Sequence, residues 1–264
     1  MSFHITAGTV GMSLAPMLFA PAVQWFGLAI TPLLAVPGLL ALAFVLRGVP
    51  PGRFSSEQRR GGLSVLRPYR RPLTLLYLIV VLRTLTSLSF ATFMPVMLTR
   101  RGWSVAEAGA AATAYLLASG IGGFFGGPLA DRFGARRVIM WSLVCAVPFL
   151  ATAPHVTGPW FIVVLALGGF FLQSTLPVNV TFAHAIAPVS AATVSSLMMG
   201  FAWGTGGLSV PLVGMLADRI GIAPSLFAFS FVPLLAALCA WPLPSGIALP
   251  MPARGADVGV PETA

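Results

Sequence analysis

The chain has 264 residues, of which 57% are hydrophobic and only 8% are charged, and its mean hydropathy is +0.93. This composition excludes an ordinary soluble domain, because about 25% of the residues of such a domain are charged. A helix that crosses a membrane needs roughly 20 apolar residues, and several runs of this sequence come close to that length or reach it. We therefore predict an all-α polytopic membrane protein.

The charged residues are strongly unbalanced, with 15 basic residues, all of them Arg, against six acidic ones. A net charge of +9 could indicate a nucleic-acid-binding protein, but the arginines gather in two short loops between apolar runs, which is the pattern of cytoplasmic loops. We expect membrane lipid and no nucleic acid as a partner. The first loop holds Arg47, Arg53, Arg59, Arg60, Arg67, Arg70 and Arg71, and the second holds Arg132, Arg136 and Arg137.

Eight apolar runs are expected to form membrane helices. They are residues 4–25, 29–46, 73–97, 106–128, 138–153, 160–184, 191–213 and 224–242. Residues 1–47 thus hold two helices, residues 48–72 an Arg-rich cytoplasmic loop, and residues 73–243 a six-helix half. Residues 244–264 are rich in Pro, Gly and Ala and are expected to be a flexible tail. With an even number of crossings, both termini are expected in the cytoplasm.

An octapeptide occurs twice, as Gly-Pro-Leu-Ala-Asp-Arg-Phe-Gly at residues 127–134 and as Gly-Met-Leu-Ala-Asp-Arg-Ile-Gly at residues 214–221. Repeats of this kind indicate duplicated units, from which many transporters are built. Three apolar spans separate the copies, so the copies should face opposite sides of the membrane. Basic residues follow only the first copy, which places it in the cytoplasm. The six-helix half is therefore expected to consist of two inverted three-helix repeats.

Residues 127–137 resemble the signature loop of the major facilitator superfamily, Gly-x-Leu-x-Asp-Arg-x-Gly followed by two basic residues. The resemblance places this loop between helices 8 and 9 of a twelve-helix fold, so the first two spans resemble helices 5 and 6 and helices 1–4 are missing from the chain. Residues 175–180 and 196–204 resemble drug exporters of the fosmidomycin-resistance type. In the first span, Ala15 stands where the exporters' antiporter motif has Gly, so that motif is only partly matched.

The resemblance implies a secondary active transporter of the plasma or inner membrane that exports small organic molecules or drugs by alternating access. The absent helices suggest a truncated transporter or one completed by a partner chain. The alternative is a non-transporting remnant, or a partner-dependent subunit that retains the helical bundle. The sequence contains no catalytic grouping and no metal-ligand spacing, so neither an enzyme nor a cofactor is expected.

Arg83 is expected to contact an anionic group of the substrate. It lies about 16 Å along its helix from Pro72, near the middle of the membrane, where a charge costs about 2.5–3.5 kcal/mol. It should therefore face the protein interior or a water-filled cavity, and Thr86 and Ser87 should share its face. The alternative is a structural Arg that is satisfied by helix ends or by a carboxylate from a missing helix.

Gln173 and Asn179 flank Pro177 in another span, and broken helices are where transporters place substrate sites. The alternative is that these two amides only form hydrogen bonds between helices. His184, near the cytoplasmic end of the same span, is a possible proton carrier, although a structural role is the alternative.

The signature loop is expected to act as a conformational switch rather than a substrate site. Asp131 could pair with a helix N-terminus or an Arg in one state of the transport cycle and separate in the other, whereas a solvated turn is the alternative. The switch residues are Gly127, Asp131, Arg132, Gly134, Arg136 and Arg137. Glycines four residues apart, at 122 and 126, at 123 and 127 and at 200 and 204, should allow helices to approach closely, although packing alone would also explain them.

Overall fold

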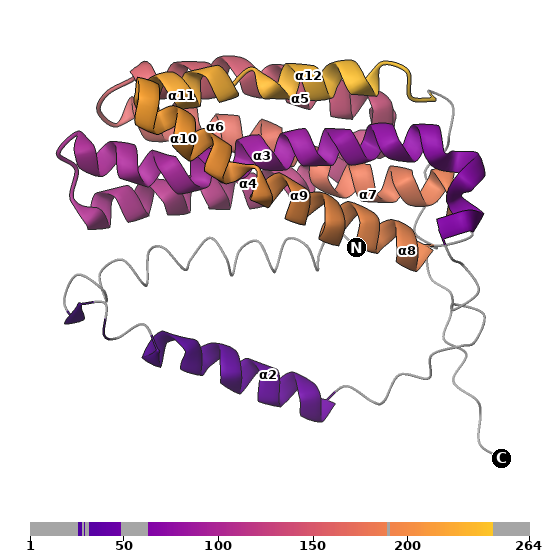
Figure 1. Cartoon of the computed structure of the whole chain (residues 1–264), viewed down its shortest axis with the longest axis horizontal. Helices are drawn as coiled ribbons and strands as arrows, with labels where there is room; N and C mark the ends of the chain where they lie inside the picture. The colour runs from indigo at the N-terminus through magenta and orange to yellow at the C-terminus, as the bar shows by residue number, and fades with distance from the viewer. Residues whose placement is uncertain (1–25, 28, 30–31, 49–62, 189–190, 245–264) are drawn as a thin grey trace.

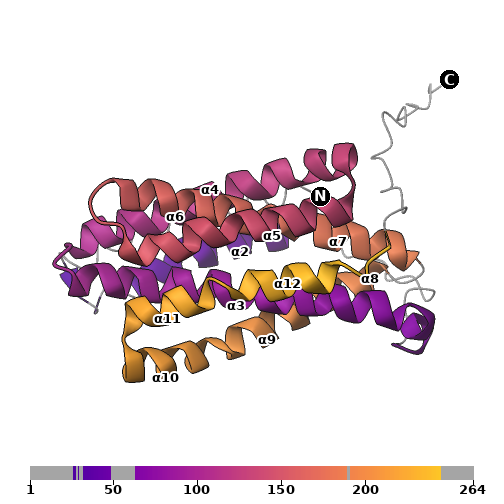
Figure 2. The same ribbon diagram turned by 90° about the horizontal axis from the view of Figure 1, so that it is seen from above.

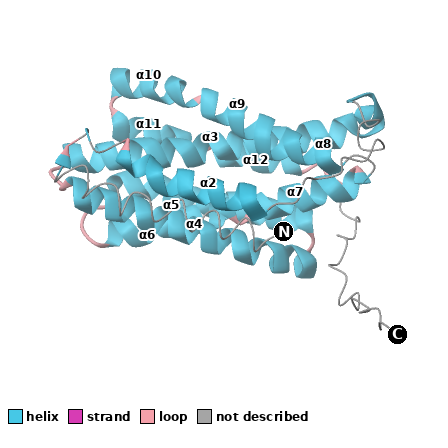
Figure 3. Cartoon of the chain, turned by 90° about the horizontal axis from the view of Figure 1, so that it is seen from below, coloured by secondary structure: helices cyan, strands magenta, loops and turns pink. Residues whose placement is uncertain are grey.

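The computed structural model describes residues 26–27, 29, 32–48, 63–188 and 191–244, and all regular structure among these residues is helical (Figures 1 and 3). Six helical segments are long and apolar enough to cross a membrane, which confirms a helical membrane protein with a six-helix half. They are Leu66–Arg100, Val105–Phe133, Ala135–His155, Trp160–Ile186, Ala192–Ile220 and Ile222–Ala240.

The predicted total of eight crossings is not confirmed. The first predicted helix, residues 4–25, lies outside the described residues. In place of the second, residues 29–46, the structure has a short 3-10 turn, η2 (Leu33–Ala35), and then α2 (Val36–Gly48). At 13 residues, α2 is roughly 20 Å long and does not by itself span a core of about 30 Å. It lies outside the bundle of long helices, and its apolar side chains are exposed, Phe44 by 81% (Figure 1).

The first helix of the bundle begins earlier than predicted. A 3-10 helix, η3 (Leu63–Tyr69), leads directly into α3 (Arg70–Arg100), so the predicted loop over residues 48–72 is too long at its C-terminal end. Pro72 does not prevent this, because it lies in the first turn of α3, where backbone N–H groups have no partner within the helix. Residues 49–62 of that loop lie outside the described residues.

The two octapeptides end helices in the same way. A single residue, Gly134, joins α4 (Val105–Phe133) to α5 (Ala135–Thr152), and Gly221 alone joins α10 (Val210–Ile220) to α11 (Ile222–Phe229). Both glycines have a positive φ, 89° and 93°, which glycine adopts without steric cost. The helices predicted to end at residues 128 and 213 are therefore too short, since each copy is helical as far as the residue before its last glycine, and residues 127–137 do not form a loop. The matching geometry supports the duplication.

Two other spans are broken. One consists of α6 (Trp160–Gln173) and α7 (Thr175–Ile186), which meet at Ser174. The other contains α8 (Ala191–Ser195), a π-helical turn (Ser196–Phe201), α9 (Ala202–Leu208) and α10, and it lies along one side of the bundle (Figure 2). The last span is α11 followed by α12 (Val232–Ala240). Of the six spans, the one from Ala192 to Ile220 is the least buried.

Helices α4 and α6 approach each other closely through their backbones. A Cβ atom added to Gly122 would lie 2.0 Å from the carbonyl oxygen of Phe170, and one on Gly126 would lie 2.0 Å from that of Ser174. The predicted close approach is confirmed for this glycine pair. It is not found at Gly200 and Gly204, where an added Cβ would meet no atom within 4 Å among the described residues.

Candidate functional site

Arg83 lies in the interior of the six-helix bundle with its side chain fully buried. Its Nη1 donates a hydrogen bond to Oε1 of Gln173 in α6, and its Nη2 donates to Oγ1 of Thr84 at 3.2 Å. The structure therefore brings together two candidates, Arg83 and Gln173, that are 90 residues apart in the sequence.

The partners of Arg83 are both neutral, and its Nε has no hydrogen-bond partner among the described residues. That part of the chain contains three acidic residues, Glu107, Asp131 and Asp218, and all are exposed near helix ends. No carboxylate among the described residues contacts Arg83. A buried charge without a counter-charge is costly, by several kcal/mol in a protein interior, and within the described structure the charge of Arg83 is uncompensated.

The break between α6 and α7 positions Gln173. Pro177 has no N–H to donate to the carbonyl group of residue 173, four positions earlier, so the helix cannot continue regularly there. The hydroxyl group of Ser174 instead turns back to the carbonyl oxygen of Phe170 at 2.8 Å. Gln173 is thus the last residue of α6 and reaches across to α3 at the break.

Asn179 is fully buried in α7, and neither Nδ2 nor Oδ1 of its amide has a partner among the described residues. The alternative in which Asn179 only bonds another helix is therefore not what the structure shows. An unsatisfied buried amide costs about 1–3 kcal/mol in proteins.

Thr86 and Ser87 do not face α6, the helix that Arg83 contacts, but face α11 and α4. The hydroxyl of Thr86 donates to the carbonyl oxygen of Leu82 and lies 3.4 Å from that of Phe229 in α11. Ser87 lies on the side of α4, where the hydroxyl of Tyr115 approaches its carbonyl oxygen at 3.4 Å. The polar stripe expected on α3 is therefore divided among three neighbouring helices. Sequence reasoning missed Tyr115, a buried Tyr whose hydroxyl needs a partner.

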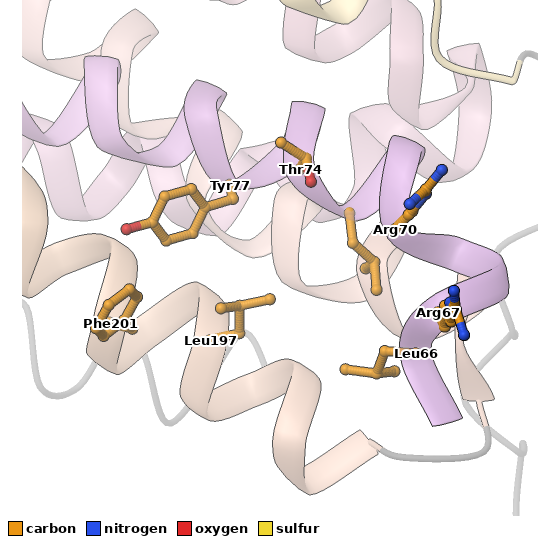
Figure 4. Close-up of a pocket in the computed structure, with 8 residues that line it drawn as sticks. Leu66, Arg67, Arg70, Thr74, Tyr77, Leu197 and Phe201 are labelled. Carbon is orange, nitrogen blue, oxygen red and sulfur yellow. The ribbon is translucent and has the colours of Figure 1, made fainter. Parts of the chain in front are cut away.

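A cavity of about 560 Å³ opens where η3 and the start of α3 face the π-helical turn (Figure 4). The hydroxyl of Tyr77 is 2.7 Å from Oγ1 of Thr205, and its ring stacks on Phe201 at 5.9 Å between centroids. Arg67 and Arg70 supply positive charge, which the sequence indicated only as a mark of the cytoplasmic side. The lining consists of Leu66, Arg67, Arg70, Leu73, Thr74, Tyr77, Leu197 and Phe201.

Arg83 does not line this cavity, since it lies 13 residues beyond Arg70, or roughly 20 Å along α3. Positive charge is therefore present at two depths of the same helix. One is accessible at its start, and the other is enclosed near its middle.

The switch residues lie at the junction of α4 and α5. Asp131 is exposed and forms no ion pair within the described part of the chain. Arg132 lies over the ring of Phe133 at 5.4 Å, and Arg136 lies over that of Trp241 at 5.8 Å. Elsewhere, Nε2 of His184 is 2.8 Å from Oγ of Ser195, so this His links α7 to α8.

Comparison with known proteins gives consistent matches. The sequence profile of the Major Facilitator Superfamily matches residues 76–250. The chain is 28% identical to the fosmidomycin resistance protein of Escherichia coli K12 over 90% of its own length and 60% of that protein. It is 41% identical to the uncharacterized MFS-type transporter YfnC of Bacillus subtilis, over 50% of this chain and 32% of that one. A D-galactonate transporter of Escherichia coli O6:H1 is 29% identical over 56% of this chain and 37% of that protein.

Among solved structures, the transporter FucP in its outward conformation matches with a TM-score of 0.59 and 17% identity, over 83% of this chain and 54% of that one. This match concerns the fold. The chain spans between about a third and three fifths of the length of the curated relatives that it matches.

Proposed function

Because the chain belongs to the major facilitator superfamily, we propose that it acts as a secondary active transporter that exports small organic anions by alternating access. Two of its relatives are named as transporters rather than as enzymes, and its six spanning helices make it a multi-pass integral membrane protein. The substrate class, the direction and the activity of this chain, alone or with a further helical segment, belong to the proposal. So do its inner-membrane location and the cytoplasmic position of both termini.

The uncompensated charge of Arg83 is the observation that carries this proposal. The guanidinium is fully buried, bonds only neutral groups and keeps Nε free of partners in the described structure. Charges at this depth in membrane proteins serve substrate or ion pathways in most cases. A carboxylate or phosphonate of a substrate would neutralise Arg83, while the unpaired amide of Asn179 would bind a second polar group.

The cavity at the start of α3 suits the entry of such a substrate. Arg67 and Arg70 attract an anion there, and Tyr77 and Phe201 offer apolar walls to the rest of the molecule. An anion would then move roughly 20 Å along α3 to reach Arg83. Two relatives, named for fosmidomycin resistance and for D-galactonate, are in accord with small organic substrates, and galactonate is itself a carboxylate.

Opening and closing would use the elements that the structure provides. The single glycine after Phe133 joins α4 directly to α5, so the two helices would move as a pair, and Asp131, which has no ion pair among the described residues, would gain one in the other state of the cycle. His184, bonded to Ser195 across two helices, is the candidate for coupling a proton to this movement.

Counterflow in proteoliposomes tests the proposal, with labelled D-galactonate and fosmidomycin as probes and neutral D-galactose as the charge control. The chain is reconstituted alone and with the first four helices of the fosmidomycin resistance protein as a separate polypeptide. Arg83→Ala should abolish anion transport. The matched control is Arg100→Ala, which removes an exposed Arg from the other end of α3 and should retain transport. Absence of transport by the wild-type chain in both preparations would favour the non-transporting remnant.

A further inference from the structure

We propose that the groove between α4, α5 and α6 is a binding site for one anionic phospholipid, with its phosphate on Arg136 and Arg137 and an acyl chain along the groove. The site is separate from Arg83 and from the cavity at the start of α3. It concerns a partner of the folded bundle and does not depend on whether the chain transports anything.

The groove has a volume of about 240 Å³ and is almost entirely apolar. From Arg137 to Cys145 it follows α5 for eight residues, or roughly 12 Å, from the helix end toward the middle of the membrane. Besides Arg137, α5 contributes the hydroxyl of Ser142 to the lining. Ser142 is buried and donates a hydrogen bond to the carbonyl oxygen of Val138 at 2.5 Å, so its hydroxyl is already paired. The lining consists of Leu129, Phe133, Arg137, Val138, Trp141, Ser142, Cys145, Phe170, Phe171 and Ser174.

A second hollow adjoins the groove at its charged end. It has a volume of about 360 Å³, is lined by Arg136, Arg137, Met140 and Trp141, and shares Arg137 and Trp141 with the groove. Together the two hollows combine an apolar channel with two guanidinium groups at one end. Trp141 is 67% exposed beside them, where Trp side chains mark the level of the lipid headgroups.

The balance of charge at this end favours an anionic headgroup over a zwitterionic one. Arg136 and Arg137 line the hollow, Arg132 is exposed on the preceding turn of α4, and Asp131 is the one acid at this end among the described residues. The guanidinium of Arg136 lies over the ring of Trp241, 5.8 Å from its centroid, and Arg136 lines the hollow. Basic pockets between helices at a membrane surface are a recognised binding mode for anionic lipids.

The opposite end of the bundle provides an internal comparison. A hollow of about 340 Å³ between α3 and α4 is lined by apolar and small residues and by Thr99, with no Arg in its wall. It can accept an acyl chain but offers nothing to a phosphate. If the shape of the hollow alone determined binding, neither hollow would prefer an anionic lipid to a zwitterionic one.

The test uses the purified full chain in nanodiscs of ordinary phosphatidylcholine. Either brominated phosphatidylglycerol or brominated phosphatidylcholine, with the bromine on the acyl chains, is then added. Bromine quenches the fluorescence of nearby Trp, and Trp141→Phe identifies the signal of Trp141. Brominated phosphatidylglycerol should quench Trp141 at concentrations at least tenfold lower than brominated phosphatidylcholine. Each Arg contributes roughly fivefold to such binding, so Arg136→Gln with Arg137→Gln should reduce the preference by up to about 25-fold, which abolishes it.

Two further variants keep the test decisive. Arg100→Gln removes an exposed Arg at the C-terminal end of α3, away from the groove, and it should leave the preference for phosphatidylglycerol unchanged. Cys145→Phe narrows the groove while both arginines remain, and it should weaken quenching by either lipid. Equal quenching by the two lipids in the wild-type chain, or a preference that survives loss of both arginines, would overturn the proposal.

Discussion

Replacing Gly122 by Ala tests the close approach of α4 to α6. An added Cβ would lie 2.0 Å from the carbonyl oxygen of Phe170, whereas ordinary contacts begin at 3.4 Å. The obstructing atom belongs to the backbone of α6, so no side-chain rotation can relieve the overlap, and the helices must separate by about 1.4 Å. Overpacking of this kind costs about 1–3 kcal/mol or more.

Gly204→Ala is the matched control, because the same methyl group there would meet no atom within 4 Å among the described residues. In a helix, Ala is favoured over Gly by about 0.8–1 kcal/mol, and this gain applies to both variants. Gly204→Ala should therefore be neutral or stabilising, and Gly122→Ala should unfold more easily than it by about 1–3 kcal/mol.

Reversible unfolding of the purified chain by SDS in mixed micelles, followed by circular dichroism, gives the free energy of unfolding of each variant. The two variants should differ in that free energy by the amount stated, and Gly126→Ala should behave like Gly122→Ala. Equal unfolding free energies for Gly122→Ala and Gly204→Ala would refute the close packing of α4 on α6.

Two further predictions concern the repeat. Gly134→Ala and Gly221→Ala should each lower the free energy of unfolding by about 1–3 kcal/mol, because both positions have a positive φ that Ala adopts only with strain. SDS titration measures this change. An unchanged free energy of unfolding at either position would show that the junction is not fixed in this conformation. Reporter fusions after Pro72, Arg101, Arg137 and Pro159 should read inside, outside, inside and outside, because the arginines mark the cytoplasmic side, and a reversal at Arg137 would contradict the inverted repeat.

Much of the fold follows from features that a single sequence displays. Hydropathy and charge are enough to predict the six spans of residues 73–243, because each must satisfy its backbone within the membrane. The octapeptide predicts the duplication, and the spacing of Gly122 and Gly126 predicts a close approach of another helix, although not that this helix is α6. The start of α4 was also predictable, since Ser104 and Glu107 form a capping box with bonds of 2.7 and 3.2 Å.

Other features depend on tertiary structure. The predicted helices end at residues 128 and 213 because Gly, Pro and charged residues usually interrupt helices, yet Pro128 lies inside α4 and Gly134 alone connects α4 to α5. The pairing of Arg83 with Gln173 needed the break at Ser174, which sets the direction of the amide. The cavity around Arg67 and Arg70 was missed because η3 brings these residues over the start of α3, whereas the sequence placed them in a loop.

Ligand binding by the purified chain tests the central claim, that Arg83 is the anion site, most directly. Thermal unfolding is measured with and without a small organic anion, and the neutral analogue of that anion is the reference. Each measurement is made on the chain alone and on the chain with the first four helices of the fosmidomycin resistance protein added as a separate polypeptide. A ligand that binds the folded state raises the unfolding temperature according to its concentration and affinity. We expect the anion to stabilise the wild-type chain and Arg83→Lys but not Arg83→Gln, with no effect of the neutral analogue. Full stabilisation of Arg83→Gln by the anion would contradict the account.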